Sequence, residues 1–193
     1  MNIEIRKLTP ALADDYVHFF DTTPHATHKE EHRCYCVWWC NDDSEGKDYL
    51  PLEKRRNYAI EYVKGGNIQG YLAYCDEQVV GWCNANTKAD CLKCYCWRRF
   101  MGAVPTEESA KVKSIFCFAV APHMKRHGIS TKLLERVCHD AAQDGFDVVE
   151  AYPNKTFIDD AEDFMGPAAL FKKAGFATHG ETEQKLIMRK PLI

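Results

Sequence analysis

The chain has 193 residues, of which 46% are apolar and 27% charged, values typical of a soluble globular protein that can bury a core. Its formal net charge of −3 provides no broad basic surface, which argues against nucleic acid as a main partner. No stretch approaches the ~18 apolar residues of a membrane helix, and the N-terminus has no apolar run typical of a signal peptide. We therefore expect a cytoplasmic protein that has no contact with membranes and folds as one domain over residues 1–193.

Hydrophobic spacing in the N-terminal half alternates between the periods of strands and helices. The signals that bound these elements are a proline after Thr9, a pair of glycines, and a tight turn at Asp76-Glu77-Gln78. In chain order, we expect a strand around residues 3–5, a helix that starts at Thr9-Pro10, a helix over 52–63 that ends at Gly65-Gly66, and a hairpin of strands over 70–75 and 79–85.

The C-terminal half begins with a mostly apolar run, 112–120, which predicts a central strand buried on both faces. An apolar stripe of Ile129, Leu133, Val137 and Ala141 then indicates a helix that ends at Gly145. The remaining predicted elements are a strand over 147–152, a loop over 153–166, a short helix over 167–174 stopped at Gly175, and closing strands over 176–178 and 186–188.

Two segments, 21–50 and 87–110, lack periodicity and are rich in cysteine and aromatic residues. Two thiolates from each could complete a tetrahedral zinc site, but the Cys-x-Cys and Cys-x-x-Cys-x-Cys spacings are not typical zinc-finger spacings. Without an export signal, reduced and partly buried thiols are favoured over disulfides and over metal. We expect His25 and His28 at the surface rather than as ligands.

The most informative segment runs from Phe118 to Thr131, where the central strand ends at Pro122 and a basic, glycine-containing turn leads into a helix. Free N–H groups and the positive end of the helix dipole meet an anion at such a turn, and Lys125 and Arg126 add charge. This arrangement predicts a phosphate-bearing, nucleotide-type ligand.

The chain resembles the GNAT superfamily of acyl-coenzyme A-dependent N-acyltransferases. Three features carry the resemblance: the segment from Val120 to Ser130, which is close to the family's basic-x-x-Gly-x-Gly/Ala pyrophosphate loop; the order of elements around it; and Leu170-Phe-Lys-Lys-Ala-Gly-Phe176, which is similar to a late Leu-Tyr-x-x-x-Gly-Phe segment. The resemblance implies an α/β (α+β) fold. Its central sheet would be mixed and mostly antiparallel, with splayed central strands flanked by helices.

The resemblance also implies acetyl-CoA as the acyl donor and assigns residues to it. The loop N–H groups would bind the pyrophosphate, main-chain groups of the central strand would pair with the pantetheine arm, and Asn154 would lie beside the gap between the strands that end at Val120 and Tyr152. Lys172 or Lys173 could reach a phosphate or simply be solvated. The cofactor-binding set is Phe118, Ala119, Val120, Lys125, Arg126, His127, Gly128, Ile129, Ser130, Thr131, Asn154 and Phe171.

Acyl transfer to an amine needs a neutral amine, a donor to the thioester oxygen, and a proton for the leaving thiolate. By resemblance, a main-chain N–H near Phe118 or Ala119 donates to the oxygen, whereas the position of the usual tyrosine acid is Phe171, which has no proton to give. Glu150 as general base and Tyr152 as acid share one strand face, and Cys117 is another candidate donor. A structural ion pair for Glu150 and a core role for Cys117 are the alternatives.

We therefore expect an N-acetyltransferase that moves an acetyl group to a primary amine of a small molecule or peptide by direct transfer in a ternary complex. Aromatic residues of the two irregular segments, or Trp82-Cys83-Asn84, could line the acceptor pocket or simply pack in the core: Tyr35, Trp38, Trp39, Tyr95 and Trp97. The alternative function is a catalytically impaired acyl-CoA-binding or metal-binding sensor. A homodimer is compatible with the sequence.

Overall fold

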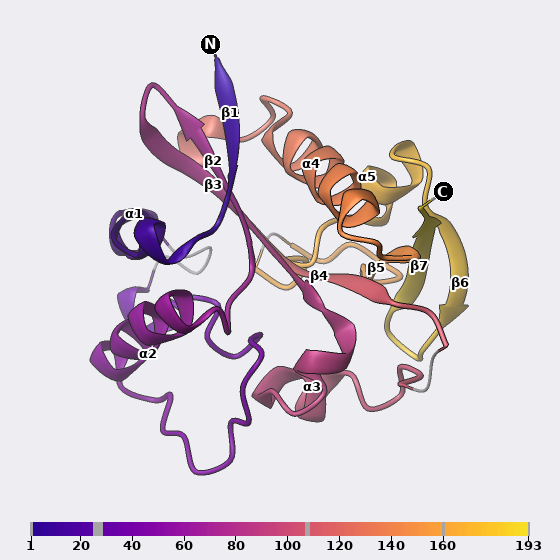
Figure 1. The fold of residues 1–193 in the computed structure, drawn as a ribbon, viewed down its shortest axis with the longest axis horizontal. Coiled ribbons are helices and arrows are strands. Elements are labelled where there is room, and N and C mark those ends of the chain that lie inside the picture. Colours follow the sequence, from indigo (N-terminus) through magenta and orange to yellow (C-terminus); the bar gives the residue numbers. More distant parts are fainter. Residues whose placement is uncertain (1, 25–28, 107–108, 160, 193) are drawn as a thin grey trace.

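The computed structural model describes residues 2–24, 29–106, 109–159 and 161–192. One seven-stranded sheet crosses the molecule in the order β1-β2-β3-β4-β5-β7-β6 (Figure 1). The strands are β1 (Ile3–Lys7), β2 (Gly70–Cys75), β3 (Gln78–Thr87), β4 (Val112–Val120), β5 (Val148–Ala151), β6 (Ala177–Glu181) and β7 (Leu186–Pro191). The β4–β5 pair is parallel and the other neighbours in the sheet are antiparallel, so the expected mixed, mostly antiparallel sheet is confirmed.

Helices cover both faces of this sheet. The α-helices are α1 (Ala13–Thr22), α2 (Leu52–Gly65), α3 (Tyr95–Phe100), α4 (Ile129–Gln143) and α5 (Ala168–Lys173), and the 3-10 turns are η1 (Pro10–Leu12), η2 (Glu30–His32), η3 (Lys88–Cys91) and η4 (Pro122–Met124). Neighbouring residues of β3 show the two faces: a Cβ at Gly81 would lie 2.8 Å from Ile129 of α4, whereas the Trp82 ring lies 4.8 Å from that of Tyr16 in α1. The helices α1 and α4 therefore pack on opposite faces.

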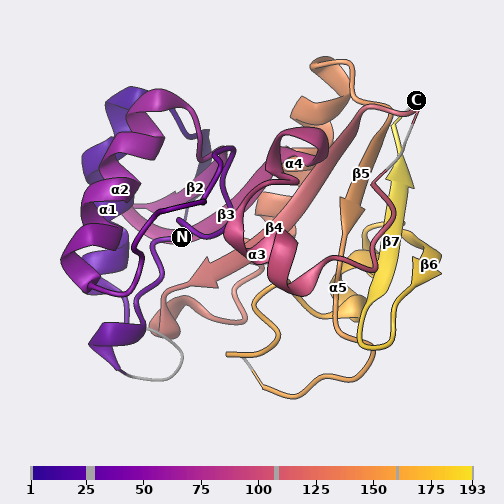
Figure 2. The ribbon, with the colours of Figure 1, turned by 90° about the horizontal axis from the view of Figure 1, so that it is seen from below.

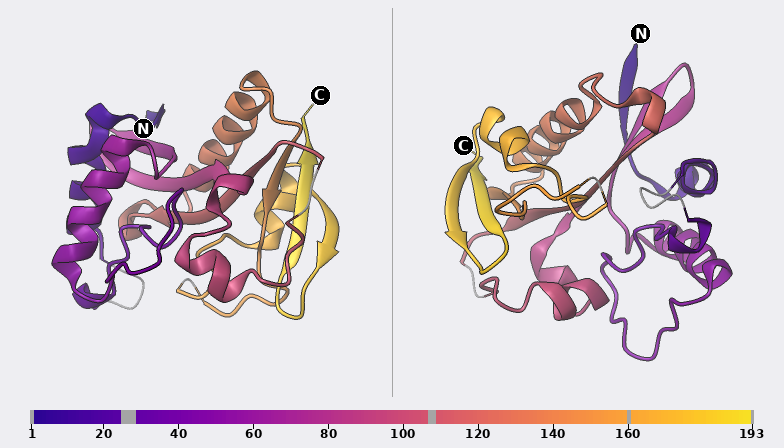
Figure 3. Two further views of the ribbon diagram at one scale, coloured as in Figure 1. Left: turned by 60° about the horizontal axis from the view of Figure 1, so that its bottom comes forward. Right: turned by 180° about the vertical axis from the view of Figure 1, so that it is seen from behind.

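In Figures 2 and 3, α1 and α2 lie together on one side of the molecule, and β6 and β7 lie on the opposite side. Between them, β4 pairs with β5 only from Val112 to Ile115, and it continues to Val120 without β5 beside it. The central strands therefore part beyond Ile115, as expected, and the gap opens towards the N-terminus of α4. A register shift in β3 between Asn84 and Ala85 lies opposite this point.

The observed elements follow the predicted order with differences at their ends. The predicted bounds of β4 are those observed, and Gly66 ends α2 in the left-handed conformation (φ 75°), as the glycine pair indicated. Thr9 is the N-cap of η1, which precedes α1, and its side chain makes no capping hydrogen bond. The segment 87–110 is not wholly irregular, since it contains η3 and α3, and the Cys94 sulfur accepts the Trp97 N–H at the start of α3.

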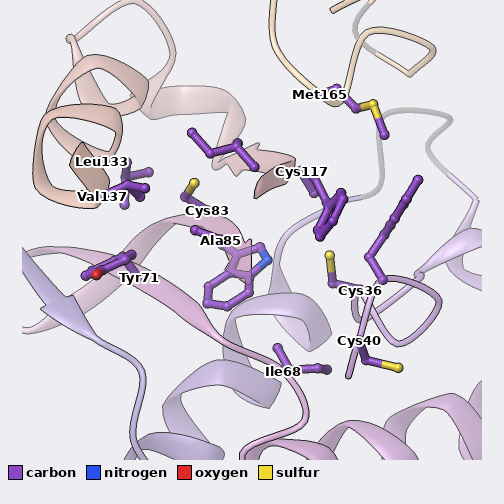
Figure 4. Packing of buried hydrophobic residues seen from close by; sticks show 14 of the residues in the cluster. Cys36, Cys40, Ile68, Tyr71, Cys83, Ala85, Cys117, Leu133, Val137 and Met165 are labelled. Atoms are coloured by element: carbon purple, nitrogen blue, oxygen red, sulfur yellow. The ribbon is translucent and has the colours of Figure 1, made fainter. Parts of the chain in front are cut away.

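The core contains many thiols. Figure 4 shows Cys36, Cys40, Cys83 and Cys117 in one apolar region with Ile68 and Met165. All ten cysteines are free. None of the helices in the described segments combines the length and the apolar character that crossing a bilayer requires.

Candidate active site

A cavity of about 830 Å³ lies where the gap between β4 and β5, the N-terminus of α4 and the two cysteine-rich segments meet. Most of the predicted site residues line it: Cys117, Phe118, Ala119, Val120, Lys125, Arg126, Gly128, Ile129, Ser130 and Thr131. The structure does not bring His127, Glu150, Tyr152, Asn154 or Phe171 to its wall. Its volume is in the range of small-molecule and cofactor sites.

The loop before α4 is built to present N–H groups. Arg126 (φ 65°) and Gly128 (φ 77°) both adopt the left-handed conformation, and no side chain caps the helix at Gly128. A Cβ at Gly128 would meet no atom within 4 Å, so the glycine is needed for its backbone conformation rather than for space. The first N–H groups of α4 have no partner within the helix, and they meet the exposed Lys125 and Arg126 at this end of the cavity.

The unpaired end of β4 forms another wall. The Phe118 N–H donates to the Phe164 carbonyl at 2.7 Å, while the Ala121 N–H donates to Val80 of β3 at 2.9 Å. Because main-chain groups alternate sides along a strand, those of Val120 face the gap together with those of Phe118. Thus one N–H that was expected to pair with a pantetheine arm is bonded to the 153–166 loop.

Asp163 organises this loop. Its Oδ2 accepts the Ile158 and Asp159 N–H groups at 2.7 and 3.1 Å, and its Oδ1 accepts Asn154 Nδ2 at 3.1 Å. Asn154 Oδ1 in turn accepts Lys185 Nζ at 2.9 Å. Asn154 therefore stabilises the loop beside the gap, and Asp163 rather than Asn154 reaches the cavity wall.

Glu150 lies in a buried ion-pair network. The side chain is fully buried, with Oε1 2.8 Å from Lys88 Nζ and Oε2 2.5 Å from Arg189 Nε. Tyr152 Oη donates to Glu150 Oε1 at 2.6 Å and lies 2.6 Å from Ser114 Oγ. The two residues share a strand face, as expected, but this face is directed into the interior of the protein rather than at the cavity.

Phe171 is also away from the cavity. Its fully buried ring packs against Phe118 and Phe176, with ring centroids 6.2 and 5.4 Å apart. A Cβ at Gly166 would lie 3.4 Å from this ring, so the loop packs tightly over it. Phe171 is thus a packing residue and has no proton to donate. Lys172 and Lys173 are exposed on α5 outside the cavity wall.

Arg55 of α2 holds the first cysteine-rich segment in place. The side chain is 3% exposed and donates to the Arg33, Tyr49 and Leu50 carbonyls at 2.8, 2.8 and 2.7 Å, and also to that of Glu31. These bonds hold the segment in place. Seven of its residues line the cavity: Thr23, Pro24, Arg33, Cys34, Cys36, Trp38 and Trp39.

Among the described residues, no group of three or more His, Cys, Asp or Glu side chains is arranged to hold a metal ion. His25 and His28 lie outside the described residues. The cysteine-rich segments therefore contribute thiols and aromatic rings to the cavity. Of the aromatic candidates, Trp38 and Trp39 line it, whereas Tyr35, Tyr95 and Trp97 do not.

Comparison with known proteins identifies the family. The family model described as acetyltransferase (GNAT) family matches residues 7–176, a range that contains β2 to β5, the loop before α4 and α5. The chain belongs to the GNAT family. Enzymes of this family use acetyl-CoA as donor, so the protein is an acetyltransferase. A comparison with curated proteins by sequence found no match.

Solved GNAT structures share the fold. A GNAT acetyltransferase from Desulfovibrio desulfuricans matches with a TM-score of 0.58 at 14% identity, over 100% of both chains. PaiA N-acetyltransferase from Thermoplasma acidophilum, solved in complex with coenzyme A, matches with a TM-score of 0.55 at 15% identity, over 99% of both chains. The ribosomal-protein-S5-alanine acetyltransferase from Vibrio fischeri matches with a TM-score of 0.58 at 10% identity, over 100% of this chain and 94% of that one.

The residues present suit acetyl-CoA. The open, basic N-terminal loop of α4 fits a pyrophosphate, and the free edge of β4 fits a pantetheine amide. When bound, acetyl-CoA supplies an activated thioester. The GNAT chain's own residues must then orient the thioester and move the protons.

Sequence reasoning missed several residues on the cavity wall. Phe157, Asp163 and Phe164 come from the loop over 153–166, and Cys36 and Cys96 come from the cysteine-rich segments. The density of cysteine and tryptophan in those segments was the available signal. It did not distinguish Cys36 from the nine other thiols.

Proposed function

We propose that this GNAT protein transfers an acetyl group from acetyl-CoA to a primary amine of a small molecule or peptide, by direct transfer in a ternary complex. The observation that carries the proposal is the continuity of one cavity. It extends from the basic loop at the N-terminus of α4, along the free end of β4, to the tryptophans of the first cysteine-rich segment. Donor and acceptor can therefore occupy it together. We also propose that residues 1–193 act as one catalytic domain.

The basic loop is the proposed pyrophosphate site. Lys125 and Arg126 supply charge, and the N–H groups from His127 to Thr131 supply donors, as in other helix N-termini that bind anions. Although the His127 side chain turns back to the Lys125 carbonyl, with Nδ1 2.9 Å from the oxygen, its main chain remains part of the loop. The positive end of α4 then orients the donor along β4.

The end of β4 is the proposed site for the thioester. Phe118, Ala119 and Val120 line the cavity there, and the main-chain groups of Phe118 and Val120 face the gap, so an N–H at the free edge can donate to the thioester oxygen as it becomes negative. Since the Phe118 N–H is bonded to Phe164, the loop must shift, or another N–H of the edge must serve. Trp38, Trp39 and Phe100 form the apolar wall proposed for the acceptor.

A panel of amines tests the proposal. The protein is incubated with acetyl-CoA and, separately, with aliphatic amines, polyamines, aromatic amines and peptides with free N-termini, while the release of coenzyme A thiol is measured. We expect release with at least one amine, with the acetylated amine identified by mass spectrometry. No release with any amine refutes the transferase proposal.

One observation favours a second candidate, an acyl-CoA-binding sensor with impaired catalysis. Neither Glu150 nor Tyr152, the expected base and acid, lines the cavity, and Phe171 occupies the position of the usual tyrosine acid. The sensor predicts tight coenzyme A binding with no thiol release on any amine, so the same panel, combined with a binding titration, separates the two functions.

A further inference from the structure

Cys36 is distinguished from the other buried thiols by the donors around its sulfur. Asn84 Nδ2 lies 3.3 Å from Cys36 Sγ, and the Cys117 thiol also donates to it. The buried Trp82 indole N–H has no hydrogen-bond partner of ordinary geometry among the described residues, and it stabilises the ionised form of the same sulfur. Three donors from β3 and β4 thus converge on one sulfur, an arrangement that suits a thiolate better than a thiol.

Cys36 and the donors Trp82 and Asn84 are all buried, so their polar groups are shielded from water. Cys36 is 1% exposed, and Trp82 and Asn84 are 0% exposed. An indole N–H and an amide in such surroundings are costly unless they meet an acceptor. Asn84 Nδ2 also donates to the Trp39 carbonyl at 2.7 Å, whereas for the Trp82 indole N–H the Cys36 sulfur is the acceptor that the geometry provides. Tyr35 (φ 46°) and Cys36 (φ 54°) are both in the left-handed conformation, which directs the Cys36 side chain at these donors.

The ionisation of Cys36 differs from that of its neighbours. Burial raises the pKa of Cys36, but the hydrogen bonds from Cys117, Asn84 and Trp82 outweigh burial, so the pKa lies below the usual value. The hydrogen bond to Cys36, together with burial, raises the pKa of Cys117, so its proton stays on Cys117. The other titratable groups that interact electrostatically with Cys36 are Tyr16, Cys34, Cys40, Cys83, Cys94 and Cys96. Burial raises the pKa of each of these six, so they stay neutral when Cys36 is ionised. Arg33 is the charged side chain that this segment adds to the cavity wall.

Cys36 and Cys117 both line the cavity, and Cys117 immediately precedes the main-chain groups proposed to bind the thioester. The pair therefore lies where the attacking amine and the leaving sulfur must meet. We propose that Cys36 and Cys117 are a thiolate–thiol pair that carries the protons of acyl transfer, with Cys36 as general base for the amine and Cys117 as general acid for the coenzyme A sulfur. The proposal rests on the transferase function proposed above.

Bonds and protons balance in this acyl transfer. As the amine nitrogen bonds to the acetyl carbon, the carbon–sulfur bond of the thioester breaks. The nitrogen loses one proton to the Cys36 thiolate, and the coenzyme A sulfur gains the Cys117 proton. The proton on Cys36 then passes to Cys117 through their hydrogen bond, which restores the pair. The pair would thereby replace the acid that Phe171 cannot provide, and a base with a pKa nearer to neutrality suits the task.

The first test needs no amine. The ultraviolet absorbance of thiolate is followed from about pH 5 to pH 10 in the wild type, Cys36→Gly and Cys40→Ala, since glycine suits the left-handed backbone at position 36. Cys40 is a buried thiol of the same segment that is not on the cavity wall. We expect one thiolate to form below the ordinary value of about 8.5 in the wild type and Cys40→Ala, and to be absent in Cys36→Gly. A wild-type titration without this step, or one that persists in Cys36→Gly, overturns the proposal.

The second test uses the acceptor found in the amine panel. Cys36→Ser and Cys117→Ser should each lower kcat at least about 100-fold while the KM for acetyl-CoA changes little, and Cys36→Ser should lose the low-pH limb of the kcat/KM profile. Unchanged kcat in Cys36→Ser overturns the proposal. Intact-mass detection of an acetyl group on Cys36 without acceptor also overturns it, because a nucleophile would then replace the base. If no amine is acetylated, the transferase function fails, and the absorbance titration still decides whether Cys36 is a thiolate.

Discussion

Replacing Glu150 with glutamine tests whether this carboxylate supports the fold or the chemistry. The substitution keeps the shape and removes the charge that lies 2.8 Å from Lys88 Nζ and 2.5 Å from Arg189 Nε. Both cations are largely buried, with side chains 4% and 17% exposed. Removing one partner of a buried pair costs about 3–5 kcal/mol, because the buried cations lose the carboxylate that neutralised them.

For a chain of this size, a loss of 1 kcal/mol lowers Tm by about 2–4 °C, so Glu150→Gln should lower Tm by roughly 6–20 °C. Thermal unfolding followed by circular dichroism measures the shift. Glu181→Gln is the control, because Glu181 is 63% exposed in its pair with Lys155 and its removal should cost less than about 1 kcal/mol. An unchanged Tm together with a collapse of turnover would refute the structural role and return Glu150 to the position of general base.

Three further outcomes follow from burial and backbone geometry. Phe171→Tyr should lower the free energy of unfolding by about 1–3 kcal/mol in urea without raising kcat, because the new hydroxyl would be buried between aromatic rings; a gain in kcat contradicts this. Gly166→Ala should lower the free energy of unfolding by about 2 kcal/mol, since φ is 89° and the new Cβ would lie 3.2 Å from the Phe118 ring. The control Gly102→Ala, whose Cβ would meet nothing within 4 Å, should lower it by less than about 1 kcal/mol. Burial lowers the pKa of Lys113 to about 8, so between that pH and about 10.4 the unfolded chain binds more protons than the folded one and stability rises with pH. Lys113→Met should reduce this pH-dependent rise in the free energy of unfolding by up to about 3 kcal/mol. An equal rise in the wild type and the variant would refute the lowered pKa of Lys113.

The sequence predicted the sheet and the loop well because both are encoded locally. The apolar run from Val112 to Val120 can be satisfied only by a strand buried on both faces, and the observed bounds of β4 are the same. The stripe from Ile129 to Ala141 gave α4, and all four stripe residues are buried. Since the loop proposed to bind the pyrophosphate connects these two elements, its position could be predicted with them.

The rest of the site depends on contacts between distant segments. The fold of the first cysteine-rich segment is set by Arg55, which follows it in sequence and binds its carbonyl groups rather than a matching charge. The surroundings of Glu150 are set by Lys88 of η3 and Arg189 of β7, which are far from it in the sequence. Hydrophobic periodicity contains no information about such long-range contacts. The sequence alone therefore could not decide whether Glu150 is a general base or part of a structural ion pair.

The cysteines illustrate the same limit. Cys36 and Cys117 have similar burial but contrasting hydrogen bonds, because Asn84 and Trp82 approach the sulfur of Cys36 from β3. The register shift beside Asn84 is a tertiary feature of the β3–β4 pair. Composition therefore indicated reduced thiols, and only the three-dimensional arrangement separates one of them from the others.

Coenzyme A binding tests the central claim, that the loop before α4 holds the pyrophosphate of acetyl-CoA. Calorimetric titration compares coenzyme A with pantetheine, which lacks the pyrophosphate, on the wild type, a Lys125→Ala/Arg126→Ala variant, and Lys64→Ala as an exposed control on α2. Hydrogen bonds to charged groups contribute about 1.5–3 kcal/mol, so the double variant should bind coenzyme A at least about tenfold more weakly, with pantetheine unaffected and Lys64→Ala equal to the wild type. Wild-type protein that does not bind coenzyme A, or a double variant that binds it as tightly as the wild type, would contradict the claim.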